Sequence, residues 1–275
     1  MDFGNLNMRL GGSQRGSGPS TPASPYLDSV LDSVVFELDA TVDESVAEAG
    51  KWKSLIAAPA DGVSQQSDWT FDAVDLTLTG EGADRHWGDF TGYMVLDVAD
   101  AEASPAFTKS LHKTAGPDFW VALAIRYKPS TRGMGFSTGL GSLNNYGIAM
   151  RSGANDQLRF QQHGDSSGAT HATPNNYFSD AADHLFIVSI NRATNQITLW
   201  NNNKTGVTAA MTFAASTNDP IDRPGLYHRG DESFAPPAGF RGYAAALGTG
   251  TLTDETAGLI FDMWSARHDR AYVPE

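Results

Sequence analysis

The chain contains no cysteine among its 275 residues, and it has no long run of apolar residues. The absence of cysteine excludes disulfide bonds and thiolate metal sites, and a core of this size needs neither. No window approaches the ~18–20 apolar residues of a membrane-spanning helix. Charged residues are scarce at 19%, whereas hydrophobic residues reach 40%, which excludes general disorder.

Basic residues are few relative to acidic ones. The 19 Lys and Arg residues against 32 Asp and Glu residues give a formal net charge of −13. A surface of that sign repels phosphate backbones and anionic membranes. We therefore expect no nucleic-acid partner and no membrane partner.

Residues 1–25 are rich in Gly, Ser and Pro and lack regular apolar spacing. Such a segment cannot bury enough surface to offset its ordering entropy, so a flexible arm is predicted. The first eighteen residues also lack the apolar centre of a secretory signal, so export by the general route is not expected. The arm is either a frayed terminus or a partner-docking segment, whose docking residues would be Phe3, Leu6, Met8, Arg9 and Leu10.

After Tyr26 the chain becomes a series of short segments in which apolar and polar residues alternate, the pattern of β-strands. The segment 119–127 is apolar on both faces, which predicts a strand near the centre of a sheet. Asn and Gly clusters at 191–195 and 201–206 predict turns, since both residues tolerate positive φ. The predicted strands are 34–39, 74–78, 119–127, 145–151, 157–162, 184–191, 196–201, 207–213 and 240–247.

One helix is predicted near the end of the chain, at about 254–268. Thr253 is a suitable N-cap, and apolar residues including Trp264 then recur at helical spacing. We expect Trp264 to pack in the core, not to form a ligand platform. With no internal repeat, residues 26–275 are predicted to form one sandwich domain after the 1–25 arm.

Four segments, in order, resemble those of the concanavalin A-like lectin/glucanase superfamily, in particular its laminin-G-like branch. They are FDAVDLTL at 71–78, PDFWVALAIRYKP at 117–129, DHLFIVSINRATNQITLWNNNK at 183–204 and GFRGYAAALGTGTLTDETAGLI at 239–260. The resemblance implies an all-β fold: a jelly-roll sandwich of two antiparallel sheets, here with one C-terminal helix and a flexible N-terminal arm. Such domains often bind glycans, sometimes with calcium.

Glycosidases of that superfamily carry an E-x-D-x-E pattern on one strand, which places two carboxylates beside the scissile bond. The nearest match here begins at Glu37 and Asp39, but Thr41 occupies the third position. We therefore interpret Glu37 and Asp39 as polar residues on a solvent face, and we expect no enzymatic activity. A glycosidase or a polysaccharide lyase is the less favoured alternative.

No metal site is predicted. The seven histidines form no H-E-x-x-H motif, although His163 and His171 flank a polar loop containing Asp165. The acid pairs Asp180 with Asp183 and Asp219 with Asp222 have no regular calcium-ligand spacing. No cofactor is expected, and calcium is the one ion whose binding the sequence leaves possible.

Aromatic and amide residues in predicted loops suit a glycan site, because sugars stack on rings while neighbouring amides bind hydroxyls. The alternative is that these aromatics plug the rim of the sandwich or make subunit contacts. The glycan-binding candidates are Trp87, Tyr146, Asn175, Asn176 and Tyr177.

The arm and the absence of a catalytic set together favour a non-enzymatic structural module of a bacteriophage virion, either a capsid decoration or a tail-fibre adhesin. Its expected partners are other virion proteins, bound through the arm, and a host polysaccharide, and a homo-oligomer is expected. The alternative is a secreted or surface carbohydrate-binding lectin, which would be extracellular.

Overall fold

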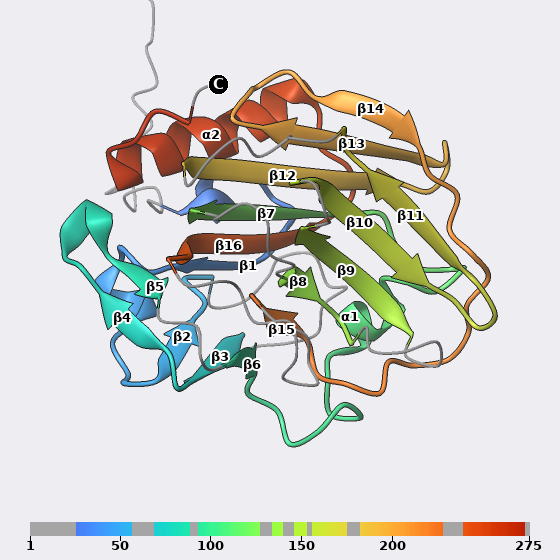
Figure 1. Cartoon of the computed structure of the whole chain (residues 1–275), viewed down its shortest axis with the longest axis horizontal. Helices are drawn as coiled ribbons and strands as arrows, with labels where there is room; N and C mark the ends of the chain where they lie inside the picture. Colours follow the sequence, from blue (N-terminus) through green and yellow to red (C-terminus); the bar gives the residue numbers. More distant parts are fainter. Residues whose placement is uncertain are drawn as a thin grey trace, which may run out of the picture.

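The computed structural model describes residues 26–56, 69–88, 93–126, 134–139, 146–152, 156–174, 182–227 and 239–272. Two antiparallel sheets of eight strands each are stacked face to face (Figure 1). A long C-terminal helix lies across the outside of one sheet. The predicted all-β jelly-roll sandwich with a single C-terminal helix is confirmed.

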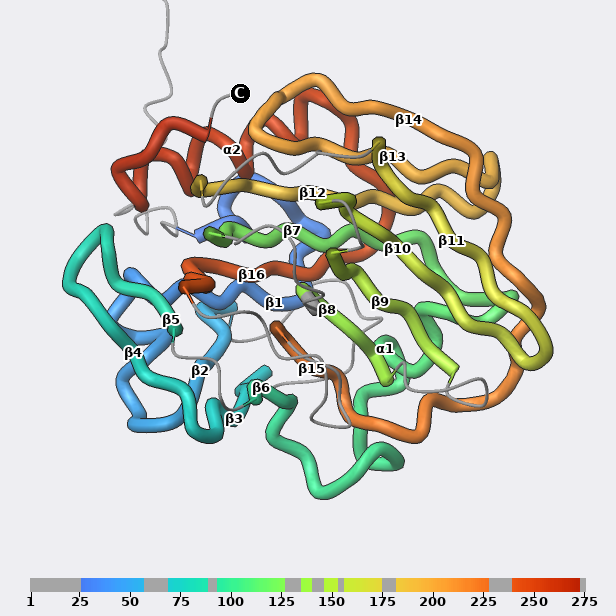
Figure 2. Tube along the Cα trace, in the orientation of Figure 1, coloured from blue at the N-terminus to red at the C-terminus, as the bar shows by residue number. Residues whose placement is uncertain are grey.

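The sheet that carries the helix is called sheet A. Its strand order is β14-β13-β12-β7-β16-β5-β4, and β1 also pairs with β16. Its strands are β1 (Val34–Asp39), β4 (Thr77–Thr79), β5 (His86–Gly88), β7 (Phe119–Arg126), β12 (Asp183–Asn191), β13 (Gln196–Asn201), β14 (Val207–Ala210) and β16 (Arg241–Thr249). The pairing of β1 with β16 brings the first and last strands side by side, as the trace in Figure 2 shows.

Sheet B has the order β11-β10-β9-β8-β15-β6-β3-β2. Its strands are β2 (Lys51–Lys53), β3 (Thr70–Val74), β6 (Tyr93–Leu96), β8 (Met134–Ser137), β9 (Gly147–Ser152), β10 (Leu158–His163), β11 (Gly168–Ala172) and β15 (Gly225–Leu226). Short helical segments are α1 (Ala106–Ser110) and the 3-10 turns η1 (Leu27–Ser29), η2 (Asp43–Ser45) and η3 (Gly82–Asp84).

The strand β7 lies between β12 and β16 and is buried on both faces, as its two-sided apolar pattern predicts. Phe119, Val121, Leu123 and Ile125 point between the two sheets into the main core. The alternate residues, including Trp120, face the other way into a second core under the helix. A strand with both faces covered is stabilised by apolar burial on each side.

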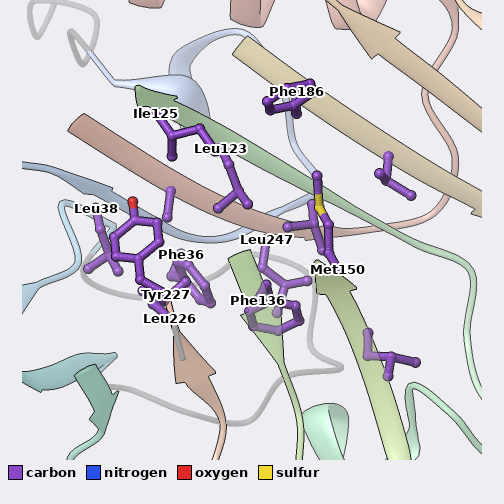
Figure 3. Close-up of a cluster of buried hydrophobic side chains, with 14 of the residues drawn as sticks. Phe36, Leu38, Leu123, Ile125, Phe136, Met150, Phe186, Leu226, Tyr227 and Leu247 are labelled. Carbon is purple, nitrogen blue, oxygen red and sulfur yellow. The ribbon is translucent and has the colours of Figure 1, made fainter. Parts of the chain in front are cut away.

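The main core fills the space between the sheets with side chains from both of them. Figure 3 shows part of this cluster, in which side chains of sheets A and B meet. Its labelled residues are Phe36, Leu38, Leu123, Ile125, Phe136, Met150, Phe186, Leu226, Tyr227 and Leu247.

The helix α2 spans Asp254–His268, the predicted range, and covers the outer side of the second core. It begins with a capping box in which the Thr253 side chain accepts from the Thr256 amide, while Thr256 Oγ1 accepts from the Thr253 amide. It ends at Asp269, whose φ is +48°. Trp264 is fully buried, so its predicted core role is confirmed. Across the described ranges, no helix combines the length and apolarity needed to cross a membrane.

The predicted strand at 74–78 is wrong in one respect, because the segment is broken in two. Asp75 adopts a φ of +55° and separates β3 from β4. The two halves then enter different sheets, β3 in sheet B and β4 in sheet A. A single residue in the left-handed region turns the chain, and the alternation of Val74, Leu76 and Leu78 does not reveal it.

Both predicted asparagine turns are confirmed. Asn195 has a φ of +52° in the turn that joins β12 to β13, and Asn202 has a φ of +49° after β13. The strand predicted at 207–213 is shorter than expected and ends at Ala210. Beyond it, the Met211 side chain is buried in the main core.

Candidate functional site

Strands β9, β10 and β11 form one end of sheet B, and their outer face is polar. On β10, burial alternates along the strand, so that Leu158 and Phe160 point into the core. The intervening side chains must therefore point away from the core, because successive strand residues face opposite sides. We call the outward polar side chains of these three strands the polar strip; they are Arg151, Arg159, Gln161, His163 and Thr170.

The strand register places these side chains next to one another. Arg159 of β10 lies directly opposite Arg151 of β9. Gln161 lies opposite Thr170 of β11. Residues directly opposite on antiparallel strands have Cβ atoms about 4.5–5.5 Å apart, so the strip is one continuous patch.

Hydrogen bonds within the strip orient its side chains. Gln161 Nε2 donates to Thr170 Oγ1 at 3.2 Å, and Arg151 Nε donates to Gln161 Oε1. Arg159 donates from Nε and Nη2 to Gln157 Oε1, at 3.2 and 2.9 Å. Gln157 is itself held by the carbonyl of Thr173 at 3.0 Å. The strip is thus preorganised by amide groups.

His163 adds a titratable ring to the strip. Burial lowers its pKa below the ordinary value of 6.5, and the nearby charge of Arg151 lowers it further. The imidazole is therefore neutral at pH 7, with one nitrogen that donates and one that accepts. A neutral ring of this kind can bind a hydroxyl group in either direction.

Tyr146, a predicted glycan-binding residue, lies directly before β9 at one end of the strip and is half-buried. Its ring stacks on His112, with centroids 6.5 Å apart and planes 20° apart. His112 is fully buried, its Nε2 contacts the Asn218 carbonyl oxygen at 2.9 Å, and burial lowers its pKa to about 4. The aromatic is therefore held in a fixed position.

At the His163 end of β10, the turn that follows the strand meets residues 215–218. Asp165 in that turn accepts from the Thr217 amide at 3.0 Å and from Asn218 Nδ2 at 2.9 Å. The Thr217 hydroxyl, which donates to Asp165 at 2.8 Å, contributes most to lowering the pKa of this carboxyl to about 2, and the amide hydrogen bonds add to its effect. The residues that follow Asn218 help to form a cleft of about 630 Å³, which is lined by Ala101, Glu102, Lys109, Asp219, Pro220 and Ile221.

Trp87 does not belong to this region. It lies on β5, is only 3% exposed and packs in the main core near Trp52, with ring centroids 6.4 Å apart. A ring with that exposure offers no face to a sugar, so Trp87 is a core residue and its expected loop position is wrong.

The other predicted contacts lie outside the described residues and stay predictions. These are the glycan-binding candidates Asn175, Asn176 and Tyr177 and the docking-arm residues Phe3, Leu6, Met8, Arg9 and Leu10.

Glu37 and Asp39 do not face solvent, contrary to the prediction, because the helix α2 covers this face of β1. Both are 0% exposed. Glu37 accepts from Trp264 Nε1 at 2.8 Å, from Arg267 at 2.7 Å and from the Leu27 amide at 2.7 Å. Burial raises its pKa in spite of these partners.

Asp39 shares the same cation. It accepts from Arg267 at 2.7 Å and from Thr41 Oγ1 at 2.6 Å, and His268 Nε2 lies 3.0 Å from its carboxylate. Burial alone would raise the pKa of Asp39, but His268 and Arg267 outweigh burial and lower it to about 2. This closed cluster fastens α2 to the sandwich, and no substrate can reach it.

Among the described residues, the acid and histidine candidates for a metal site do not converge; Asp180 lies outside these residues. Asp183 pairs with Arg126 at 2.9 Å and with Arg270 at 3.0 Å. His163 lies opposite Gly168, whereas His171 lies opposite Phe160, so these two rings belong to different faces of sheet B. The part of the chain that the structure describes holds no group of three or more His, Asp or Glu residues placed to bind a metal.

Comparison with known proteins identifies the fold but no family. No family model matches the chain, and no curated protein matches it. Solved structures do match. The binding domain of botulinum neurotoxin DC, in complex with SialylT, gives a TM-score of 0.56 at 10% identity over 85% of this chain. The fold is a lectin-like jelly roll.

Two further structures agree with that result. Trypanosoma rangeli sialidase in complex with sialic acid gives a TM-score of 0.56 at 10% identity over 86% of this chain. Botulinum neurotoxin type C, whose cell entry depends on interaction with two ganglioside molecules, gives a TM-score of 0.55 at 11% identity over 85% of this chain. The chain spans 51% and 52% of the two toxin chains and 33% of the sialidase.

Sequence reasoning missed the arginines and the glutamine of the polar strip. The signal was present, because Arg159 and Gln161 alternate with Leu158 and Phe160 inside a predicted strand. Their position opposite Arg151 and Thr170 depends on strand register, which a single strand does not reveal.

Proposed function

We propose that this protein is a non-enzymatic, glycan-binding module and that the polar strip is its binding face. The observation that carries the proposal is the strip itself: hydrogen-bonding side chains of three adjacent strands, in register and partly exposed. The matched toxin binding domain in complex with SialylT and the matched sialidase in complex with sialic acid support the choice of a glycan.

Each member of the strip offers a group that sugar hydroxyls bind. The amide of Gln161, the hydroxyl of Thr170 and the neutral ring of His163 all supply both a donor and an acceptor. Tyr146, fixed at the end of the strip, supplies a ring on which the apolar C–H face of a sugar can stack.

The absence of a catalytic role is part of the proposal. The Glu37–Asp39 pair, which matches the glycosidase pattern in part, is sealed beneath α2 and neutralised by Arg267. A glycosidase needs both carboxylates in an open groove beside the bond that it cleaves.

Replacing Gln161 by alanine is expected to weaken glycan binding about 5- to 30-fold, because the loss of a buried hydrogen-bond partner costs about 1–2 kcal/mol. A glycan array identifies the ligand, and titration calorimetry then compares the variants. Gln196→Ala is the matched control, since Gln196 is an exposed glutamine on sheet A. Binding that is equal in Gln161→Ala and the unsubstituted protein would place the site elsewhere.

We also propose that the 1–25 arm attaches the domain to a virion. Removing residues 1–25 is expected to abolish co-sedimentation with particles and to leave the unfolding midpoint unchanged, because both cores lie within residues 27–272. Density-gradient fractionation of a lysate, probed with an antibody, measures the first effect. A truncated protein that still co-sediments contradicts the docking role, and a full-length protein found only in the soluble fraction favours the secreted lectin.

A further inference from the structure

Two arginines of the polar strip face each other across neighbouring strands. Arg151 and Arg159 occupy directly opposite positions of the antiparallel pair β9–β10. Like charges in that position destabilise a sheet. Arg159 lies in this position on a chain with 32 acidic and only 19 basic residues, where carboxylate partners are plentiful.

Arg159 is held in place without being neutralised. Its side chain donates to the uncharged Oε1 of Gln157, and within the described residues no carboxylate lies within ion-pair distance of it. Arg126, in contrast, forms a two-pronged pair with Asp183, and Arg267 joins Glu37 and Asp39. The positive charge of Arg159 thus remains available to a ligand.

The geometry suits a planar anion. Arg159 uses Nε and Nη2 toward Gln157, which leaves the Nη1 donors of its guanidinium group for another acceptor. Side chains that are directly opposite begin about 5 Å apart, so the charge of Arg151 adds to the positive potential around Arg159. Guanidinium groups bind carboxylates in two-pronged fashion, and burial of the pair by a ligand strengthens that attraction.

From these observations we propose that Arg159, with Arg151 opposite it, is a carboxylate-binding residue, so that the strip selects acidic glycans over neutral ones. This inference rests on the proposed function, since it names the class of sugar taken by the same site. A polyanion is not favoured, because a net charge of −13 repels densely charged chains far more than a single sugar carboxylate.

The test uses the full chain and two matched pairs of singly charged and neutral probes: 3′-sialyllactose with lactose, and a methyl galacturonoside with its carboxyl-reduced form. We expect the acidic member of at least one pair to bind 10-fold or more tightly than its neutral counterpart. Arg159→Gln should remove that preference and leave the affinity for the neutral member within 2-fold. Lys53→Gln, which removes an exposed charge at the far edge of sheet B, should leave the preference intact.

A stability measurement separates binding from a structural role. Without ligand, Arg159→Gln should unfold at the same temperature as the unsubstituted protein or higher, because it removes a like-charge contact. A midpoint lowered by several degrees would make Arg159 a structural residue and overturn the inference. Equal binding of acidic and neutral probes, lost in Gln161→Ala, overturns the carboxylate-binding role of Arg159 and leaves the glycan site standing. Binding of no probe and no array glycan overturns both.

Discussion

Replacing Arg267 by methionine is expected to lower the free energy of unfolding by about 3–5 kcal/mol, because removing one partner of a buried ion pair leaves its charge uncompensated. Here two carboxylates are affected, since Arg267 donates to both Glu37 and Asp39 at 2.7 Å. Both acids are 0% exposed, so water cannot replace the lost cation. Methionine keeps the length and apolar character of the stem, which limits the effect to the lost charge.

Urea-induced unfolding at pH 7 measures this change, with Lys204→Met as the control. Lys204 pairs with Asp262 on the exposed side of α2, where an ion pair is worth about 1 kcal/mol or less. A loss of less than 1 kcal/mol in Arg267→Met would show that the cluster is not what fastens α2 to sheet A.

The free energy of unfolding that Arg267→Met loses should increase as the pH rises. Burial already raises the pKa of Glu37 above its ordinary value of 4.5, and Arg267 is the largest of the influences that lower it. Without Arg267 the folded pKa rises further, so folding becomes less favourable as pH increases through that value. The loss in free energy of unfolding should therefore be smallest below about pH 4.5 and largest near neutrality.

Replacing Gly248 by alanine is expected to cost about 1–3 kcal/mol or more, the usual penalty for overfilling a packed core. A Cβ at this position of β16 would lie 2.1–2.4 Å from atoms of the Trp120 ring. Trp120 is fully buried in the second core, and its Nε1 donates to Ser33 Oγ at 3.2 Å, so the ring has no room to move. The indole is packed directly against the glycine.

Thermal unfolding compares this variant with Gly258→Ala, a glycine-to-alanine change in the middle of α2. There the new Cβ meets only Lys204 Cδ, at 3.7 Å, which is an ordinary contact. Because alanine favours helix over glycine, Gly258→Ala should raise stability by about 0.5–1 kcal/mol. Equal effects of the two substitutions would contradict the tight packing of Trp120 on β16.

Local pattern accounts for most of the secondary structure. The two-sided apolar run at 119–127 predicts the central strand β7, and the capping residue Thr253 predicts the start of α2. Asn195 and Asn202 predict turns because their side chains tolerate a positive φ. These features depend on a few neighbouring residues, so they can be predicted without knowing which distant segments pack against them.

Features that depend on a distant partner could not be predicted in this way. Glu37 and Asp39 read as polar residues on a solvent face, because nothing near them shows that Arg267, 230 and 228 residues further along the chain, will cover and neutralise them. Trp87, with charged neighbours in sequence, looks like a loop aromatic, yet its ring enters the core beside Trp52.

The sequence by itself determined the class of fold: a cysteine-free, acidic chain of alternating segments, closed by one amphipathic helix, can bury its apolar residues only as a sandwich with a helix on one sheet. Only the tertiary structure decided which faces are covered and which polar residues meet. Register placed Arg159 opposite Arg151 and Gln161 opposite Thr170, and a shift of one residue would have turned these side chains into the core. The candidate site is therefore a property of strand pairing, which is set by contacts between segments far apart in the chain.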